Sequence, residues 1–179
     1  MRGLAGEVIC AWATCHHLGS FAMVLLKKRI PGATAALFER FVRRACGAVK
    51  LKGTVNVLIT HDSEMRSLNR RFRARDAATD VLSFPAVPGL PGKLAGDLAI
   101  SGDIAAENAK QLGHTVEDEI KILILHGALH LAGYDHETDN GKMARKEAQL
   151  RVGLRLPVAL IARTAVSAGT PPSTRRRKP

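Results

Sequence analysis

The sequence predicts a single α/β domain, with a central mixed β-sheet, helices packed on it and a metal site at the end of a central helix. Its 179 residues are about the length of one domain. Between residues 23 and 156, short apolar β-branched runs alternate with longer segments that carry apolar residues at three- and four-residue spacing. No apolar run approaches the roughly 18 to 20 residues that a membrane span needs, so we expect a soluble protein.

Four segments have the composition of strands, and a turn or loop signal follows most of them. They are residues 23–28 (MVLLKK), 54–60 (TVNVLIT), 81–85 (VLSFP) and 96–101 (GDLAIS). Proline stops the third strand at residue 85, and the Pro/Gly-rich residues 86–96 are predicted to form a loop. A sheet of these strands therefore gives the domain its centre.

Five segments are predicted to be helical: residues 33–50, 62–72, 103–113, 115–133 and 142–154. The first should bury one apolar side, formed by Leu37, Phe41, Ala45 and Ala48. Asp62 is predicted to cap the second helix, and Thr115 with Asp118 forms a capping box that starts the fourth. Gly113 ends the third helix and Gly133 ends the fourth.

The two ends of the chain differ in composition from the rest. Residues 1–22 are predicted to be an N-terminal extension, disordered or weakly packed, and Met23 is a possible functional start. Residues 23–160 form the predicted domain, and the Pro/Ser/Arg-rich residues 161–179 a basic disordered tail. Three cysteines without C-x-x-C spacing indicate neither a disulfide framework nor a cysteine zinc site, so we expect a reducing cytoplasm.

The chain is strongly basic, with a formal net charge of +11 and a pI near 10.2. Between Lys27 and Lys52 there are eight basic residues and one acidic residue, Glu39. Five arginines lie between residues 66 and 75, with no acidic residue before the last of them. Each cluster alone is explained equally well by a solvated helix face and by contact with an anionic partner. The two together favour an anionic partner, most often nucleic acid.

Three of the seven histidines lie within HGALHLAGYDH, residues 126–136. His126 and His130 are four residues apart, so a helix projects both from the same face. Gly133 then ends the helix, and the returning chain can bring His136 to face the other two. Three neutral imidazoles leave one coordination position open, which is typical of a catalytic zinc ion. A lone histidine in an apolar helix is usually a core residue, but this combination favours a metal site.

The same spacing occurs in metzincin proteases, whose motif is H-E-x-x-H-x-x-G-x-x-H. Gly127 stands where those enzymes have the glutamate that acts as general base, and without that carboxylate a peptidase loses its means of activating water. Met143 follows the motif without a Met-turn sequence, so we expect it to fill the core. Proteolysis is therefore the less favoured chemistry.

The sequence resembles the bacterial YbeY family of metal-dependent endoribonucleases. HGALHLAGYDH matches that family's H-G-x-L-H-L-x-G-Y-D-H signature, LNRRFRARDAATDVLSFP is similar to its second hallmark, and GDLAIS to its G-D-I segment. The resemblance covers roughly residues 23–156. It implies an α/β fold with a mixed sheet and a metal in a basic cleft, one zinc ion at the three histidines, and a functional arginine at Arg73. It also implies a role at the 3′ end of small-subunit rRNA and in ribosome quality control.

Arginines and a metal ion suit phosphodiester cleavage, because both stabilise the negative charge that develops on phosphate oxygens. Arg73 is the arginine expected to contact phosphate. The alternative, a merely solvated side chain, applies more strongly to the other candidates for guiding the RNA backbone, which are Arg66, Arg70, Arg71 and Arg75.

Four further residues lie within or beside these motifs. Asp135 either orients a ligating imidazole by accepting its other N–H or caps the turn. Tyr134, the only tyrosine, packs against the site or closes the core. Asp80 is expected to stabilise a turn, and Ser83 to pack rather than to line the cleft.

Three functions are consistent with the sequence. The first is a zinc-dependent endoribonuclease of single-stranded RNA, with precursor small-subunit rRNA and the ribosome or its small subunit as partners. The second is a metzincin-like zinc hydrolase of another substrate. The third is a ribosome-assembly factor that binds RNA and uses zinc only to stabilise its fold. No oligomeric state is indicated.

Overall fold

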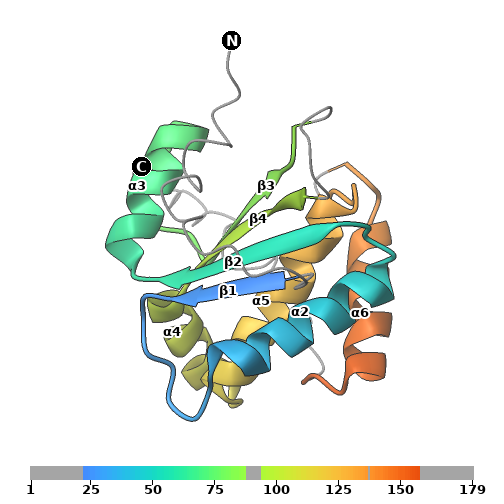
Figure 1. Cartoon of the computed structure of the whole chain (residues 1–179), viewed down its shortest axis with the longest axis horizontal. Coiled ribbons are helices and arrows are strands. Elements are labelled where there is room, and N and C mark those ends of the chain that lie inside the picture. Colours follow the sequence, from blue (N-terminus) through green and yellow to red (C-terminus); the bar gives the residue numbers. More distant parts are fainter. Residues whose placement is uncertain (1–21, 88–93, 137, 158–179) are drawn as a thin grey trace, which may run out of the picture.

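The computed structural model describes residues 22–87, 94–136 and 138–157 (Figure 1). Its strands are β1 (Ala22–Leu26), β2 (Thr54–Thr60), β3 (Val81–Pro85) and β4 (Leu94–Ser101). They form one sheet in the order β1-β2-β4-β3, in which β1, β2 and β4 are parallel and β3 is antiparallel to β4. The predicted mixed sheet is therefore confirmed.

Five helices pack on this sheet: α2 (Ala35–Val49), α3 (Asp62–Arg73), α4 (Gly102–Leu112), α5 (Val116–Leu131) and α6 (Lys142–Leu154). The main core joins buried side chains of α2, α4, α5 and α6 to one face of the sheet, including Leu98 and Ile100. The opposite face carries α3, where Met65 packs with Leu82 and Ala99. Because successive side chains of β4 alternate between faces, the sheet separates the two clusters.

The buried side of α2 is rotated from the predicted one. Phe41 and Ala45 are buried as expected, but Leu37 and Ala48 are only half-buried, and Phe38 takes the fully buried place. Both rotations satisfy an apolar spacing of three and four residues. Packing against β1 and α5 selects the one that buries both phenylalanines.

The predicted cap of α3 is wrong, whereas that of α5 is confirmed. His61 is the N-cap residue of α3, and Asp62 lies inside the first turn, where its carboxylate accepts a hydrogen bond from the Ser101 hydroxyl. At α5, the Thr115 hydroxyl accepts from the Asp118 N–H (3.1 Å) and donates to the Asp118 carboxylate (2.8 Å). In α3 the Asp62 carboxylate is thus bound to a residue distant in sequence instead of capping its own helix, whereas in α5 the local cap forms.

Two other predictions about the chain have clear outcomes. Met143 fills the core, with 1% of its surface exposed. The loop predicted over 86–96 ends earlier, since β4 begins at Leu94. Residues 1–21, 88–93 and 158–179 lie outside the described part of the chain, so the proposed extension and tail are not tested. None of the described helices combines the length and the hydropathy of a membrane span.

Candidate metal centre

The helix α5 carries two of the three histidines and packs closely against the sheet. A Cβ atom at Gly127 would lie 2.6 Å from Leu98 Cδ2 and 3.3 Å from Ser83 Oγ, so only glycine lets the helix approach β3 and β4 this closely. This contact fixes the rotation of α5 about its axis. It also gives Ser83 the packing role expected of it.

A glycine stop turns the chain back after α5. Gly133 has φ +88°, its N–H donates to the His130 carbonyl (3.0 Å), and the Tyr134 N–H donates to the Leu129 carbonyl (3.1 Å). These two bonds form a Schellman motif, in which the left-handed residue is normally glycine. Tyr134 packs against the main core, and the chain returns toward the helix with His136.

The three imidazoles converge as predicted. One nitrogen from each of His126, His130 and His136 can be chosen so that all three lie within 4.8 Å of one another. The Nε2 atoms of His126 and His130 are 3.1 Å apart. Two nitrogens bound at 2.0–2.1 Å to one tetrahedral zinc ion lie about 3.3 Å apart, so this pair has a suitable separation. The three residues can therefore hold a metal ion.

A carboxylate that the sequence did not reveal supports His126 from α6. The Nδ1 atom of His126 lies 2.9 Å from Glu147 Oε2, and since a carboxylate only accepts, Nδ1 carries the proton and Nε2 keeps its lone pair. Glu147 also accepts from Arg151 Nε (3.0 Å). In the sequence Glu147 and Arg151 resemble an ordinary exposed pair four residues apart, yet Arg151 is only 4% exposed.

Burial and charge favour the ligand forms of these side chains. Burial lowers the pKa of His130, and the neighbouring His126 and His136 lower it further, against opposing effects of the Tyr134 backbone and Asp135. Burial alone would raise the pKa of Glu147, but its hydrogen bond with His126 and the electrostatic attraction of that ring's N–H, together with the charge and hydrogen bonds of Arg151, bring it to about 2. His130 is thus neutral and Glu147 ionised near pH 7.

Asp135 and Asp80 both take part in turns. The Asp135 carboxylate accepts a hydrogen bond from the Thr138 hydroxyl (3.0 Å), as in the predicted turn cap. Orientation of an imidazole by Asp135 stays a prediction. Asp80 Oδ1 accepts from the Val81 N–H (2.8 Å), and its carbonyl accepts from the Ser101 N–H (2.9 Å), which agrees with its expected structural role.

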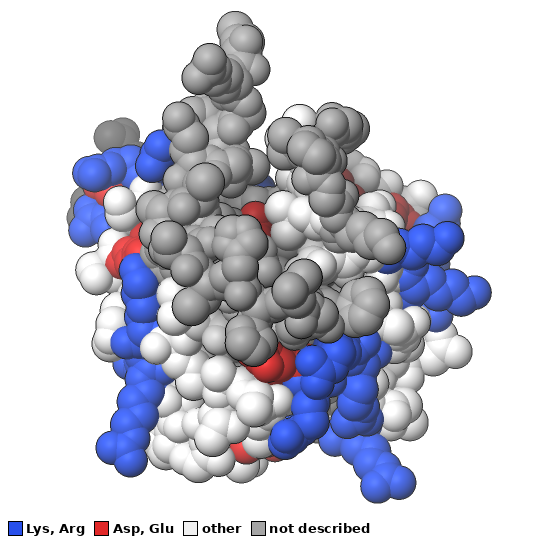
Figure 2. All heavy atoms as spheres, viewed as in Figure 1, with Lys and Arg blue, Asp and Glu red and all other residues white. Residues whose placement is uncertain are grey.

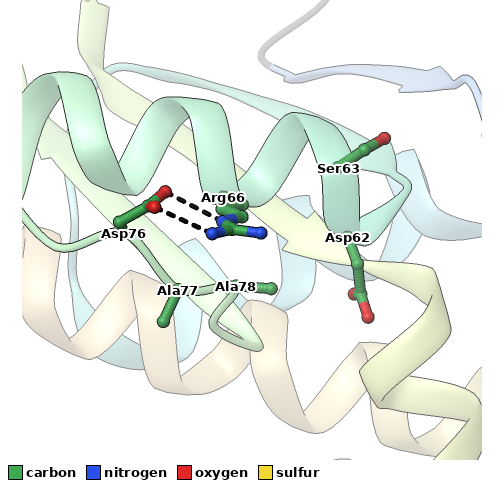
Figure 3. Close-up of a pocket in the computed structure, with 6 residues that line it drawn as sticks. All are labelled: Asp62, Ser63, Arg66, Asp76, Ala77 and Ala78. Atoms are coloured by element: carbon green, nitrogen blue, oxygen red, sulfur yellow. Dashed lines mark hydrogen bonds and ion pairs between the residues drawn. The ribbon is translucent and has the colours of Figure 1, made fainter.

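The arginines of α3 and the following loop differ in their contacts. Arg66 donates two hydrogen bonds of 2.8 Å to the exposed Asp76 carboxylate. This pair borders a shallow pocket of about 480 Å³ whose lining includes none of the three histidines (Figure 3). The Arg71 guanidinium lies 5.3 Å from the ring centre of Phe72. The remaining three candidates are exposed and make no ion pair within the described ranges: Arg70, Arg73 and Arg75.

A chain of contacts links the end of α3 to the end of α5. The Phe72 ring packs edge-to-face on Phe84, with centroids 5.2 Å apart. A Cβ atom at Gly96 would meet both the Phe84 carbonyl (2.5 Å) and the Leu131 side chain (2.7 Å). Phe72, next to Arg73, and Leu131, next to His130, therefore pack on the same part of the β3–β4 pair, from opposite faces of the sheet.

Known proteins are similar to this chain in sequence and in fold. The model of the family described as Endoribonuclease YbeY matches residues 26–154. A protein of Koribacter versatilis named endoribonuclease YbeY is 53% identical over 142 residues, which cover 79% of this chain and 91% of that protein. One of Solibacter usitatus with the same name is 54% identical over 125 residues, covering 70% and 82%.

A solved structure has the same architecture. The solution structure of a Thermotoga maritima protein is similar with a TM-score of 0.51 and 30% identity, covering 74% of this chain and 88% of that one. The match to the family model includes β2 to β4 and all three histidines, and the two relatives cover most of the described domain. This chain belongs to the endoribonuclease YbeY family.

Proposed function

We propose that this chain is a zinc-dependent endoribonuclease that cleaves single-stranded RNA, with residues 23–160 as the catalytic domain. The observation that carries the proposal is the convergence of His126, His130 and His136, one of them held by the half-buried Glu147. The curated relatives are named as endoribonucleases. By extension from the resemblance, the substrate is the 3′ end of precursor small-subunit rRNA, and the protein works with the ribosome in cytoplasmic quality control.

Each side chain has a distinct task in this proposal. The three histidines hold one zinc ion, which when bound supplies Lewis-acid stabilisation of charge on the phosphate. Glu147 keeps the proton of His126 on Nδ1 and so directs Nε2 toward the ion. Arg73 binds the nonbridging phosphate oxygens with its guanidinium.

The other arginines are proposed to guide the RNA backbone to different degrees. Arg70, Arg71 and Arg75 are exposed and can contact phosphates directly. Arg66 must exchange its Asp76 partner before it can do so. It is therefore the weakest of the proposed contacts.

The packing at Gly127 argues against a metzincin-like hydrolase. Position 127 faces Leu98 and Ser83 of the sheet, so a glutamate there would meet the core. The close packing of α5 on the sheet thus excludes a glutamate general base at this position. RNA binding with a purely structural zinc ion is the alternative that an activity assay must separate from catalysis.

Cleavage of a defined RNA, with and without a chelator, tests the proposal. His130→Ala should abolish cleavage and leave most RNA affinity intact, whereas the exposed His61→Ala, outside the cluster, should cleave normally. Chelator-insensitive cleavage, or equal cleavage by both variants, would contradict a metal-dependent enzyme. Retained RNA binding without any cleavage would favour the assembly factor, and digestion of casein would favour the other hydrolase.

A further inference from the structure

The outer face of α2 carries a row of basic residues that the proposed active site does not use. Arg40, Arg43, Arg44 and Lys50 are all exposed and lie at spacings of three, four and six residues, opposite the buried side of the helix. The three arginines make no ion pair with any residue that the structure describes. In the space-filling view, basic side chains gather over α2 (Figure 2). We define these four residues as the α2 ridge.

A glycine lies at the centre of the α2 ridge without a packing reason. Nothing lies within 4 Å of a Cβ atom built at Gly47, and the residue is exposed in the interior of the helix. Glycine disfavours a helix relative to alanine, but its lack of a side chain leaves the backbone open to close approach. The ridge is about 15 Å long, given the rise of a helix, and presents its cations around this open position at Gly47.

The helix that carries the α2 ridge packs beside the two helices that carry the metal centre. The helix α2 packs against both α5, which carries His126 and His130, and α6, which carries Glu147. Figure 1 shows α2 beside α6 on the same side of the sheet. The first turn of α6 exposes Lys142 and Arg145, only a few residues after His136. Exposed basic side chains are thus present both on α6, close in the chain to His136, and on the neighbouring α2.

We infer that the α2 ridge binds the phosphate backbone of the RNA that flanks the cleaved bond. This inference rests on the proposed RNA cleavage and adds a second contact surface to it. Exposed cations without internal partners release counterions when they neutralise phosphates, and this contact does not depend on sequence. Substrates long enough to reach both surfaces should bind more tightly than short ones, with no change in the chemical step.

The test compares two variants that lose the same charge. Arg40→Gln/Arg44→Gln removes two ridge cations, and Arg29→Gln/Lys110→Gln removes two exposed cations elsewhere. Glutamine keeps a high helix propensity, so α2 should stay folded, and thermal unfolding checks this. Binding of a 30-nucleotide RNA is measured by fluorescence anisotropy in the non-cleaving His130→Ala chain, at several salt concentrations.

A slope of about −0.7 per phosphate contact corresponds to roughly fourfold in affinity per contact at 0.15 M salt. We therefore expect the ridge variant to bind about 15-fold more weakly, with a salt slope smaller by about 1.4, and the control variant to bind within about twofold of its parent. In the cleaving background, the ridge variant should raise KM for the long RNA, with kcat unchanged, and cleave a six-nucleotide RNA normally.

Equal weakening by both variants, or none by the ridge variant, overturns the inference, and normal cleavage by the parent chain would show that the proposed function still stands. A parent chain that neither binds nor cleaves RNA overturns both. Ridge-dependent binding of phosphatidylglycerol vesicles, with RNA binding unaffected, would assign the surface to membranes instead.

Discussion

Replacement of Glu147 by glutamine tests whether this half-buried carboxylate prepares His126 for a metal ion. The amide keeps the shape of the side chain but removes the negative charge that stabilises the proton on His126 Nδ1. In the wild-type chain this nitrogen lies 2.9 Å from Glu147 Oε2. Loss of such a supporting partner typically lowers metal affinity 10- to 100-fold, which is about 1.4 to 2.7 kcal/mol. We expect a loss of zinc affinity in this range.

The substitution also leaves Arg151 buried without its carboxylate partner. Breaking a buried ion pair from one side costs about 3–5 kcal/mol, an upper bound here because glutamine can still accept one hydrogen bond. The double variant Glu147→Gln/Arg151→Met removes both charges and should recover most of this stability. It should not recover the zinc affinity, because His126 still lacks the negatively charged carboxylate beside its Nδ1 atom.

Zinc affinity is measured by competition with a chromogenic chelator at pH 7.5, and stability by urea unfolding of the metal-free chain. Glu107→Gln, the same change at an exposed position of α4, is the matched control and should alter neither quantity. A Glu147→Gln chain that binds zinc within threefold of the wild-type chain would refute the supporting role. Recovery of affinity in the double variant would show instead that the loss came from unfolding.

Three further predictions concern stability and reactivity. Burial raises the pKa of Asp97 to about 6, so the folded chain holds a proton there that the unfolded chain has already lost. The free energy of unfolding should therefore fall by up to about 3 kcal/mol as the pH rises from 4 to 6. Asp97→Asn should abolish this fall in urea titrations, and an unchanged pH profile in that variant would contradict the prediction. Gly127→Ala should cost about 1–3 kcal/mol by meeting Leu98, whereas Gly47→Ala, in open space, should gain about 0.5–1 kcal/mol, and thermal unfolding that reversed this order would be inconsistent with the packing. Because burial raises the pKa of Cys46 to about 11, iodoacetamide at pH 8 should modify it only after denaturant is added, as mass mapping would show.

Local patterns in the sequence predicted most of the fold. The limits of α6 and β2 agree with the predicted 142–154 and 54–60, because apolar periodicity and turn residues are local signals. The convergence of the three histidines was also predictable, since helical spacing and a glycine stop act within eleven residues. The sequence resemblance to the family made the site assignment specific.

Contacts between distant segments were not predictable in this way. Asp62 does not cap α3 because Ser101, 39 residues further along the chain, donates to its carboxylate. Glu147 reaches His126 across 21 residues, and only the packing of α6 on α5 brings them together. Arg66 stays a candidate for RNA contact, but its pairing with Asp76 was not evident from the sequence. In each of these three cases the tertiary fold selects the partner of a polar side chain.

The Schellman turn at Gly133 divides the metal ligands between two kinds of support. His126 and His130 are fixed on a helix in which residues 122–125 and 127–129 are buried, whereas His136 is exposed on the returning chain. Depletion of the ion should therefore leave amide protons of α5 protected from hydrogen exchange, while those that follow Gly133 exchange faster. We therefore expect this chain to lose and rebind a metal ion while α5 stays folded.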